Sequence, residues 1–112
     1  MTMTNKDFDL FIDAGFRAWA DGCLAADAHK KDGGACNFDS VKLYIRYGSA
    51  KCARLLARLG FRVYLEKRGV LRVFSPFGGQ AEKRTAAVEA IAKAFNSFNI
   101  PNVHAYVDYV MD

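Results

Sequence analysis

Four short segments of alternating apolar and polar residues, interleaved with segments of helical spacing, most constrain what this chain can fold into. An alternation with a period of two is typical of strands with one buried face. It predicts strands over 41–47, 61–65, 70–74 and 103–109. Apolar residues at steps of three and four predict helices over 6–28, 50–59 and 80–97. The expected order is therefore helix, strand, helix, two strands, helix, strand.

Glycines and polar residues mark the ends of these segments. Residues 29–40 are polar and contain a glycine pair, so a loop is expected there. Ser49 is a candidate N-cap and Gly60 a candidate C′ glycine for the helix between them. One continuous helix over 40–59 is the competing interpretation, and Gly48 argues against it.

The order of the last six segments, over residues 40–110, is βαββαβ, which is the order of the ferredoxin-like fold. That fold places two helices on one face of a four-stranded antiparallel sheet. The prediction is a single α+β domain over residues 1–112, with an extra N-terminal helix over 6–28. The helical spacing predicts that its inward side carries Phe8, Phe11, Ile12, Phe16, Trp19, Cys23 and Ala26. Gly15 and Gly22 are expected to weaken this helix.

The composition is that of an ordinary folded domain. The chain has 112 residues, of which 52% are hydrophobic and 25% charged. No apolar run approaches the roughly 20 residues that cross a bilayer, and the first residues lack the pattern of a secretory signal. A cytoplasmic protein without a membrane partner is expected. No two of the three cysteines form a CxxC pair, so no disulfide framework, metal site or cofactor is expected.

The net charge of +4 is unevenly distributed. Residues 40–75 contain one acid, Glu66, and nine basic residues. The basic residues are Lys42, Arg46, Lys51, Arg54, Arg58, Arg62, Lys67, Arg68 and Arg72. Residues 1–32 contain six aspartates. A basic middle segment favours an acidic partner, and that partner could be the N-terminal helix of the chain itself.

The strand alternation predicts two sheet faces of different chemistry. The face expected on the helices carries Val41, Leu43, Ile45, Phe61, Val63, Leu65, Leu71, Val73, Val103, Ala105 and Val107. The other face carries Lys42, Tyr44, Arg46, Arg62, Tyr64, Glu66, Val70, Arg72, Phe74, His104, Tyr106 and Asp108. Rings stack on bases and cations meet phosphates, so the second face suits single-stranded nucleic acid.

Two of these strands resemble the consensus segments of the RNA-recognition motif. Leu43-Tyr44-Ile45 resembles the first segment, and 68–74 (RGVLRVF) keeps the basic-glycine start and the later valine of the second. The second segment lacks the aromatic residue after the glycine and the paired aromatics further on. Two alternatives to an open binding face remain: the acidic, aromatic helix over 6–28 covers it, or two copies pair sheet to sheet.

A second basic surface is expected on the helix over 50–59. Lys51, Arg54 and Arg58 follow one another at helical spacing, opposite the apolar side of this helix. With Ser49, Lys51 also lies at the N-terminus of the helix, where anions bind. The alternative is an ordinary solvated helix face.

Signals of catalysis are weak. Neither histidine has metal-ligand spacing, and Gly78-Gly79 lacks the ending of a phosphate loop. The loop at 47–51 lacks both the arginine of acylphosphatases and the CxxC of ferredoxin-like metal carriers. The chain is therefore not expected to be an enzyme.

Three functions remain open. The first is a non-catalytic module that binds nucleic acid or a nucleoprotein complex. The second is a small protein-binding inhibitor or regulator, because phage-encoded anti-defence proteins, the anti-CRISPR proteins among them, resemble this chain in size and in lacking a catalytic motif. The third is a homodimeric, ligand-sensing module. The candidate binding residues are Lys51, Arg54 and Arg58 on the helix, and Lys42, Tyr44, Arg46, Arg62, Tyr64, Arg72, Phe74 and Tyr106 on the sheet.

Overall fold

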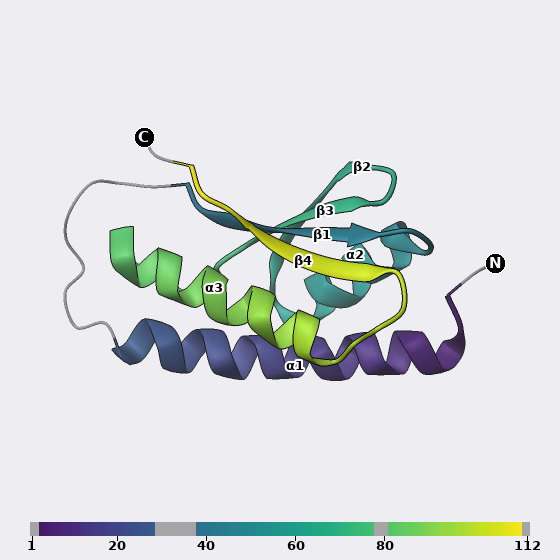
Figure 1. The fold of residues 1–112 in the computed structure, drawn as a ribbon, viewed down its shortest axis with the longest axis horizontal. Helices are drawn as coiled ribbons and strands as arrows, with labels where there is room; N and C mark the ends of the chain where they lie inside the picture. The colour runs from purple at the N-terminus through teal and green to yellow at the C-terminus, as the bar shows by residue number, and fades with distance from the viewer. Residues whose placement is uncertain (1–2, 29–37, 78–80, 111–112) are drawn as a thin grey trace.

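The computed structural model describes residues 3–28, 38–77 and 81–110 (Figure 1). Its elements, in chain order, are α1 (Asn5–Ala28), β1 (Ser40–Ile45), α2 (Ser49–Leu59), β2 (Arg62–Lys67), β3 (Val70–Phe74), α3 (Ala81–Ser97) and β4 (Val103–Asp108). Each predicted segment is present with ends about two residues or less from those expected, and the competing continuous helix over 40–59 is wrong. Most of the predicted loop at 29–40 lies outside the described residues.

The four strands form one antiparallel sheet in the order β2-β3-β1-β4. Helix α2 connects β1 to β2, with β3 lying between these two strands. Helix α3 likewise connects β3 to β4, with β1 between them. The α+β class is therefore confirmed.

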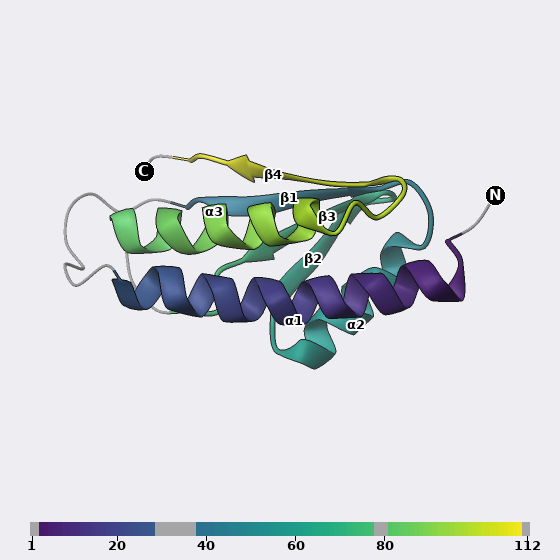
Figure 2. The same ribbon diagram turned by 60° about the horizontal axis from the view of Figure 1, so that its bottom comes forward.

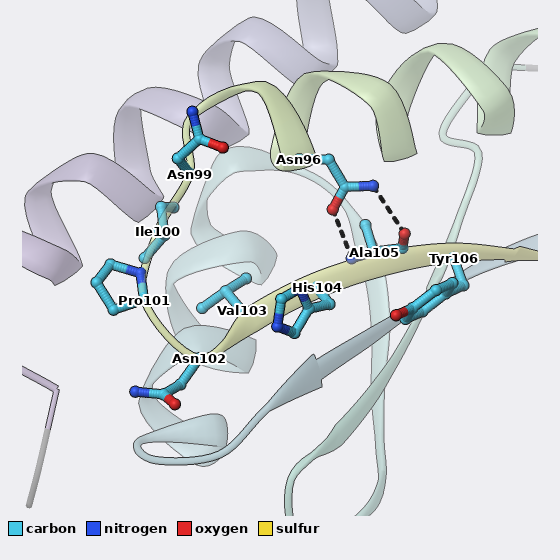
Figure 3. A pocket seen from close by; sticks show the side chains of 9 residues that line it. All are labelled: Asn96, Asn99, Ile100, Pro101, Asn102, Val103, His104, Ala105 and Tyr106. Carbon is cyan, nitrogen blue, oxygen red and sulfur yellow. Dashed lines mark hydrogen bonds between the residues drawn. The ribbon is translucent and has the colours of Figure 1, made fainter.

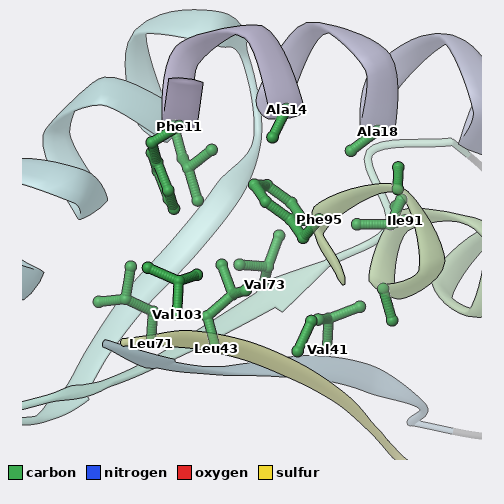
Figure 4. Close-up of a cluster of buried hydrophobic side chains, with 14 of the residues drawn as sticks. Phe11, Ala14, Ala18, Val41, Leu43, Leu71, Val73, Ile91, Phe95 and Val103 are labelled. Atoms are coloured by element: carbon green, nitrogen blue, oxygen red, sulfur yellow. The ribbon is translucent and has the colours of Figure 1, made fainter. Parts of the chain in front are cut away.

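All three helices lie on the same side of the sheet (Figure 2). Helix α1 runs alongside α3 and crosses α2, so it extends the helical layer. The rings of Phe11 on α1 and Phe95 on α3 have centroids 5.4 Å apart, and both are fully buried above the sheet residues Leu43 and Val73 (Figure 4). The alternative in which this helix covers the other sheet face is wrong.

Small residues bring α1 close to the other two helices. Ala14 and Ala18 are fully buried between α1 and the core. A Cβ on Gly15 would lie 2.7 Å from Leu59 Cδ1 of α2, and one on Gly22 would lie 2.9 Å from Ile91 Cγ1 of α3. These glycines cost helix propensity, as expected, but they allow contacts that a larger residue would prevent. Apart from Phe11, the buried residues of α1 are therefore small. The prediction that Phe16 points inward is wrong, because 59% of it is exposed.

The sheet side of the core follows the predicted alternation with two exceptions. Val41, Leu43, Ile45, Leu71 and Val73 are fully or almost fully buried. Leu65 is 47% exposed, because its strand β2 lies at an edge and the β2–β3 register shifts at this point. Val70 is only 5% exposed although it pairs with Tyr44 on the opposite face, where larger side chains surround it.

The ends of α2 are set by two glycines. Gly60 has φ 105° and donates its N–H to Ala57 O, which confirms the predicted C′ glycine. The predicted N-cap is wrong, because Gly48 occupies that position with φ 77°. The hydroxyl of the buried Ser49 instead accepts a hydrogen bond from Gly69 N at 3.1 Å. Ser49 thus joins α2 to the β2–β3 turn.

Cys52 belongs to the core between α2 and the sheet. It is fully buried, and this burial raises the pKa of its thiol to about 12. Cys52 is a free cysteine. Across the described residues, no helix combines the length and the apolar character that spanning a membrane requires.

Replacing Gly22 by alanine tests the close approach of α1 to α3. The new methyl group would lie 2.9 Å from the Cγ1 methylene of Ile91 and 3.0 Å from the ring of Phe77. Overpacking costs about 1–3 kcal/mol, which outweighs the gain of about 1 kcal/mol in helix propensity. Gly22→Ala is expected to lower the free energy of unfolding, measured by urea denaturation.

Gly15→Ala is the matched control. Its methyl group would meet the terminal Cδ1 of Leu59, which can rotate away. The control is therefore expected to change stability less than Gly22→Ala. Equal or greater stability of Gly22→Ala relative to the wild type would contradict the packing.

Candidate nucleic-acid interface

The sheet face that points away from the helices is uncovered by any described element (Figure 2). We call it the open face. Cross-strand pairing places its residues in rows, of which the central one is Tyr64, Arg72, Lys42 and Tyr106. The three tyrosines Tyr44, Tyr64 and Tyr106 are 42%, 56% and 58% exposed. Exposed aromatic side chains that share one face form the kind of patch that marks an interaction site, so this face is the first candidate for binding.

One aromatic pair lies at the β1–β4 side of the open face. The rings of Tyr44 and Tyr106 meet edge to face, with centroids 5.5 Å apart and planes at 78°. Together with His104 they line a shallow depression of about 390 Å³. The edge-to-face contact holds the two rings against each other, while both side chains stay exposed to solvent.

A basic hollow adjoins this pair at the end of the sheet. It has a volume of about 490 Å³ and is lined by Tyr44, Arg46, Arg68, Asn102 and His104, among others. Backbone hydrogen bonds hold the segments together: Arg46 N donates to Asn102 O at 3.1 Å, and Ile45 N donates to Gly69 O at 2.8 Å. Three separate turns thereby bring two guanidinium groups next to the first aromatic pair.

A further hollow of about 370 Å³ follows the outer edge of β4 (Figure 3). Asn96 of α3 lies beside this edge, where its amide donates to Ala105 O at 2.9 Å and accepts from Ala105 N at 2.8 Å. The side chains of His104 and Tyr106, on either side of Ala105 in the chain, project from β4. The side-chain amide of Asn96 therefore fixes the position of the strand that carries both rings.

The second aromatic pair lies at the β2–β3 side. The rings of Tyr64 and Phe74 also meet edge to face, with centroids 5.7 Å apart and planes at 84°. They line a hollow of about 310 Å³ together with Phe38, Arg62 and Arg84. Each end of the open face thus carries two aromatic rings that contact each other, and guanidinium groups lie nearby.

An ion-pair network centred on Arg72 separates the two aromatic pairs. Arg72 Nη1 donates to Asp108 Oδ2 and to Ser40 Oγ, both at 2.7 Å. Its Nη2 donates to Glu66 Oε1 at 2.9 Å, and Lys42 Nζ lies 3.8 Å from Glu66 Oε2. Two cations therefore face two carboxylates. The acidic groups that balance the basic sheet residues come from β2 and β4, not from α1.

The network changes the ionisation of its members. The hydrogen bond from Arg72 lowers the pKa of Glu66 below its ordinary value, and the nearby positive charges add to this effect. The hydrogen bond to Asp108 is the main cause that raises the pKa of Arg72. Both groups are therefore held in their charged forms, and the donors Nε, Nη1 and Nη2 of Arg72 are all engaged. The ligand-binding roles of Arg72 and Lys42 stay predictions.

The basic stripe on α2 is exposed but lies on the other side of the molecule. Lys51, Arg54 and Arg58 all reach solvent, whereas α2 lies in the layer opposite the open face. Lys51 Nζ is 4.0 Å from the ring centroid of Phe8, so α1 holds one cation of the stripe in place. The hydroxyl of Ser49 accepts a hydrogen bond from Gly69 N and does not cap the N-terminus of α2. One short ligand cannot contact both the stripe and the open face.

Sequence reasoning found both aromatic pairs but missed the residues that surround them. Arg68 and Asn102 lie in turns, where alternation has no meaning, and Phe38 precedes the first strand. No local pattern marks these three residues as neighbours of the tyrosines. Only the meeting of distant turns brings them to the two ends of the face.

Nothing else in the described part of the chain identifies a chemistry. Its His, Cys, Asp and Glu residues form no group of three or more that could hold a metal ion. Comparisons with protein-family models, curated proteins and solved structures found no match to the chain. Any function must therefore be inferred from the geometry of the described surfaces, of which the open face is the first candidate.

The pKa of Glu66 provides a test of the network. Because the folded-state pKa is lowered, the ion pair stabilises the fold above the ordinary glutamate pKa, and this contribution disappears as the pH falls through the lowered value. A carbon-13 NMR titration of the side-chain carboxyl is expected to show a midpoint below that of an ordinary glutamate. In the Arg72→Gln variant the midpoint should rise towards the ordinary value. An unchanged midpoint would contradict the network.

Proposed function

We propose that this protein is a non-catalytic module that binds single-stranded nucleic acid, free or within a nucleoprotein complex, through the open face. The observation that carries the proposal is the exposure of Tyr44, Tyr64 and Tyr106 on a sheet face that α1 leaves uncovered. Stacking of a base on such a ring contributes about 1–3 kcal/mol and tolerates any sequence. Nothing in this role requires a catalytic residue or a cofactor.

Cations at both ends of the open face support the proposal. Arg46 and Arg68 line the hollow beside Tyr44, and Arg62 lines the hollow beside Tyr64. Among the described residues, none of these three arginines forms an ion pair with a carboxylate. Their guanidinium groups are therefore available to phosphate oxygens, which they bind with paired hydrogen bonds.

We further propose that residues 40–110 form a ferredoxin-like core. Each of the two βαβ units is split, with a strand of the other unit inserted between its own two strands. The order from the β4 edge is β4-β1-β3-β2, and α1 is an addition to the helical layer. In this arrangement the described helices cover one face of the sheet and leave the opposite face to a ligand.

The proposal is tested by fluorescence anisotropy with labelled single-stranded RNA and DNA of twelve nucleotides. Three arginine–phosphate contacts predict a slope of about −2 for log affinity against log salt, so affinity should fall roughly 20-fold between 50 and 200 mM salt. Tyr44→Ala and Tyr106→Ala should each weaken binding by about tenfold, the equivalent of about 1.4 kcal/mol of lost stacking.

Tyr109→Ala is the matched control, since Tyr109 is 60% exposed but lies outside the two aromatic pairs and their hollows. It should leave affinity unchanged. A failure to bind either nucleic acid at micromolar concentration in low salt would overturn the proposal. Sheet-to-sheet pairing of two copies would bury the same tyrosines, so light scattering that shows a stable dimer before ligand is added would count against it as well.

A second candidate function, binding of a protein partner, is favoured by the outer side of α1. Phe16 and Leu24 are 59% and 69% exposed and lie two helical turns apart. The exposed carboxylates of Asp9, Asp13 and Asp27 flank them. An acidic helix face with two apolar side chains is suited to a basic protein surface with apolar pockets.

Leu24→Glu tests this second function. The substitution lies on the surface, so it should leave the thermal unfolding midpoint unchanged. A protein captured from a nuclease-treated lysate by the wild type should be lost with Leu24→Glu and retained with Lys93→Glu, a control on the exposed side of α3. Equal capture by all three proteins would exclude α1 as the docking surface.

A further inference from the structure

We infer that the open face binds a single strand that crosses the sheet from β4 to β2 and contacts it at two separate aromatic pairs. This inference rests on the proposed function and names its ligand class: an oligonucleotide long enough to reach both pairs, rather than a mononucleotide or a strand end. The first pair is Tyr44 with Tyr106, and the second is Tyr64 with Phe74.

Strand pairing fixes how far apart the two pairs lie. Tyr106 pairs with Lys42, Lys42 pairs with Arg72, and Arg72 pairs with Tyr64. Tyr106 and Tyr64 are therefore the two ends of one row across all four strands. Neighbouring strands are about 4.8 Å apart, so three spacings separate these residues by about 14 Å.

This separation sets a minimum length for the ligand. A stacked strand advances about 3.4 Å per nucleotide, so about four steps, or five nucleotides, cover the distance. A strand stretched to about twice that advance covers it in two steps, or three nucleotides. A mononucleotide or dinucleotide can occupy only one aromatic pair at a time.

The centre of the open face separates two contacts rather than adding a third. Arg72 and Lys42 face Glu66 and Asp108, so the row between the tyrosines is electrically balanced. A phosphate that crosses it would meet carboxylates as well as cations. Arg46, Arg68 and Arg62, which form no ion pair with a carboxylate of the described residues, lie instead beside the aromatic pairs. Binding energy is thereby concentrated at the two ends.

Two weak contacts on one rigid sheet act as a bivalent site. Once one end of a strand is bound, the second contact forms at a high effective concentration, which raises affinity by about 10²-fold or more when the linker spans the gap. Affinity should therefore rise in a step as the ligand becomes long enough to reach both pairs. Beyond that length it should rise only slightly.

The test is a titration of the full chain with fluorescein-labelled oligouridylates and oligothymidylates of two, four, six and eight nucleotides. The expected result is a gain of at least tenfold between two and six nucleotides and less than threefold from six to eight. Tyr64→Ala and Tyr106→Ala should each lower affinity for the hexanucleotide at least tenfold. Each should lower affinity for the dinucleotide about twofold at most, because the other pair still binds it.

Controls separate this inference from the proposed function. Tyr109→Ala should leave the affinity at every oligonucleotide length unchanged. Tyr64→Phe should keep the gain in affinity between two and six nucleotides that Tyr64→Ala loses, because a phenyl ring also stacks on a base. Absence of binding at every length would overturn the proposed function together with the inference. A smooth increase with length, or a loss of affinity in only one of the two alanine variants, would overturn the two-contact site and leave nucleic-acid binding standing. The length series on the wild type decides the question even if a variant does not fold.

Discussion

The close approach of α1 to α2 and α3 determines the rest of the molecule. A long helix with an aromatic, acidic sequence could have covered either side of the sheet. Apart from Phe11, its buried stripe consists of small residues, which let its backbone lie against Leu59 and Ile91. These small residues are Ala14, Gly15, Ala18, Gly22 and Ala26. Such a flat surface fits between the ridges of neighbouring helices. All described helices therefore lie on one side of the sheet, and α1 leaves the opposite face, with its three exposed tyrosines, uncovered.

Much of the fold could be predicted from the sequence, because the spacing of apolar residues indicates the type of each element, and glycines and polar residues mark its ends. Each strand and helix was expected with nearly correct ends, and Gly60 marked the end of α2. The place of α1 could not be predicted in this way. Large residues such as Phe16 dominate a hydrophobic pattern, whereas the close approach of the helices depends on Gly15 and Gly22, which contribute little to that pattern. Ser49 shows the same limit, since its hydroxyl accepts a hydrogen bond from Gly69, in a distant turn, instead of capping α2.

The candidate site was predictable in part for the same reason. Alternation placed Tyr44, Tyr64, Arg72 and Tyr106 on one face, because a strand leaves a side chain only two directions. It could not show that Arg72 is held by Glu66 and Asp108, since these partners come from different strands. Nor could it bring Arg68 and Asn102 to the first aromatic pair. A basic residue in a strand therefore indicates where a charge points, and only the fold shows whether that charge is already neutralised.

Asn96 has a consequence for how this sheet meets other molecules. An unpaired strand edge is a template onto which another chain can add, and repetition of that step produces fibres. At Ala105 the outer edge of β4 is already hydrogen-bonded to a side-chain amide of the same molecule. At the other edge, Arg62 and Lys67 bring positive charges that repel a second copy. The sheet can thus expose aromatic rings on one face while its two edges disfavour the addition of a strand from another molecule. An exposed aromatic face is thereby separated from the risk of edge-to-edge association.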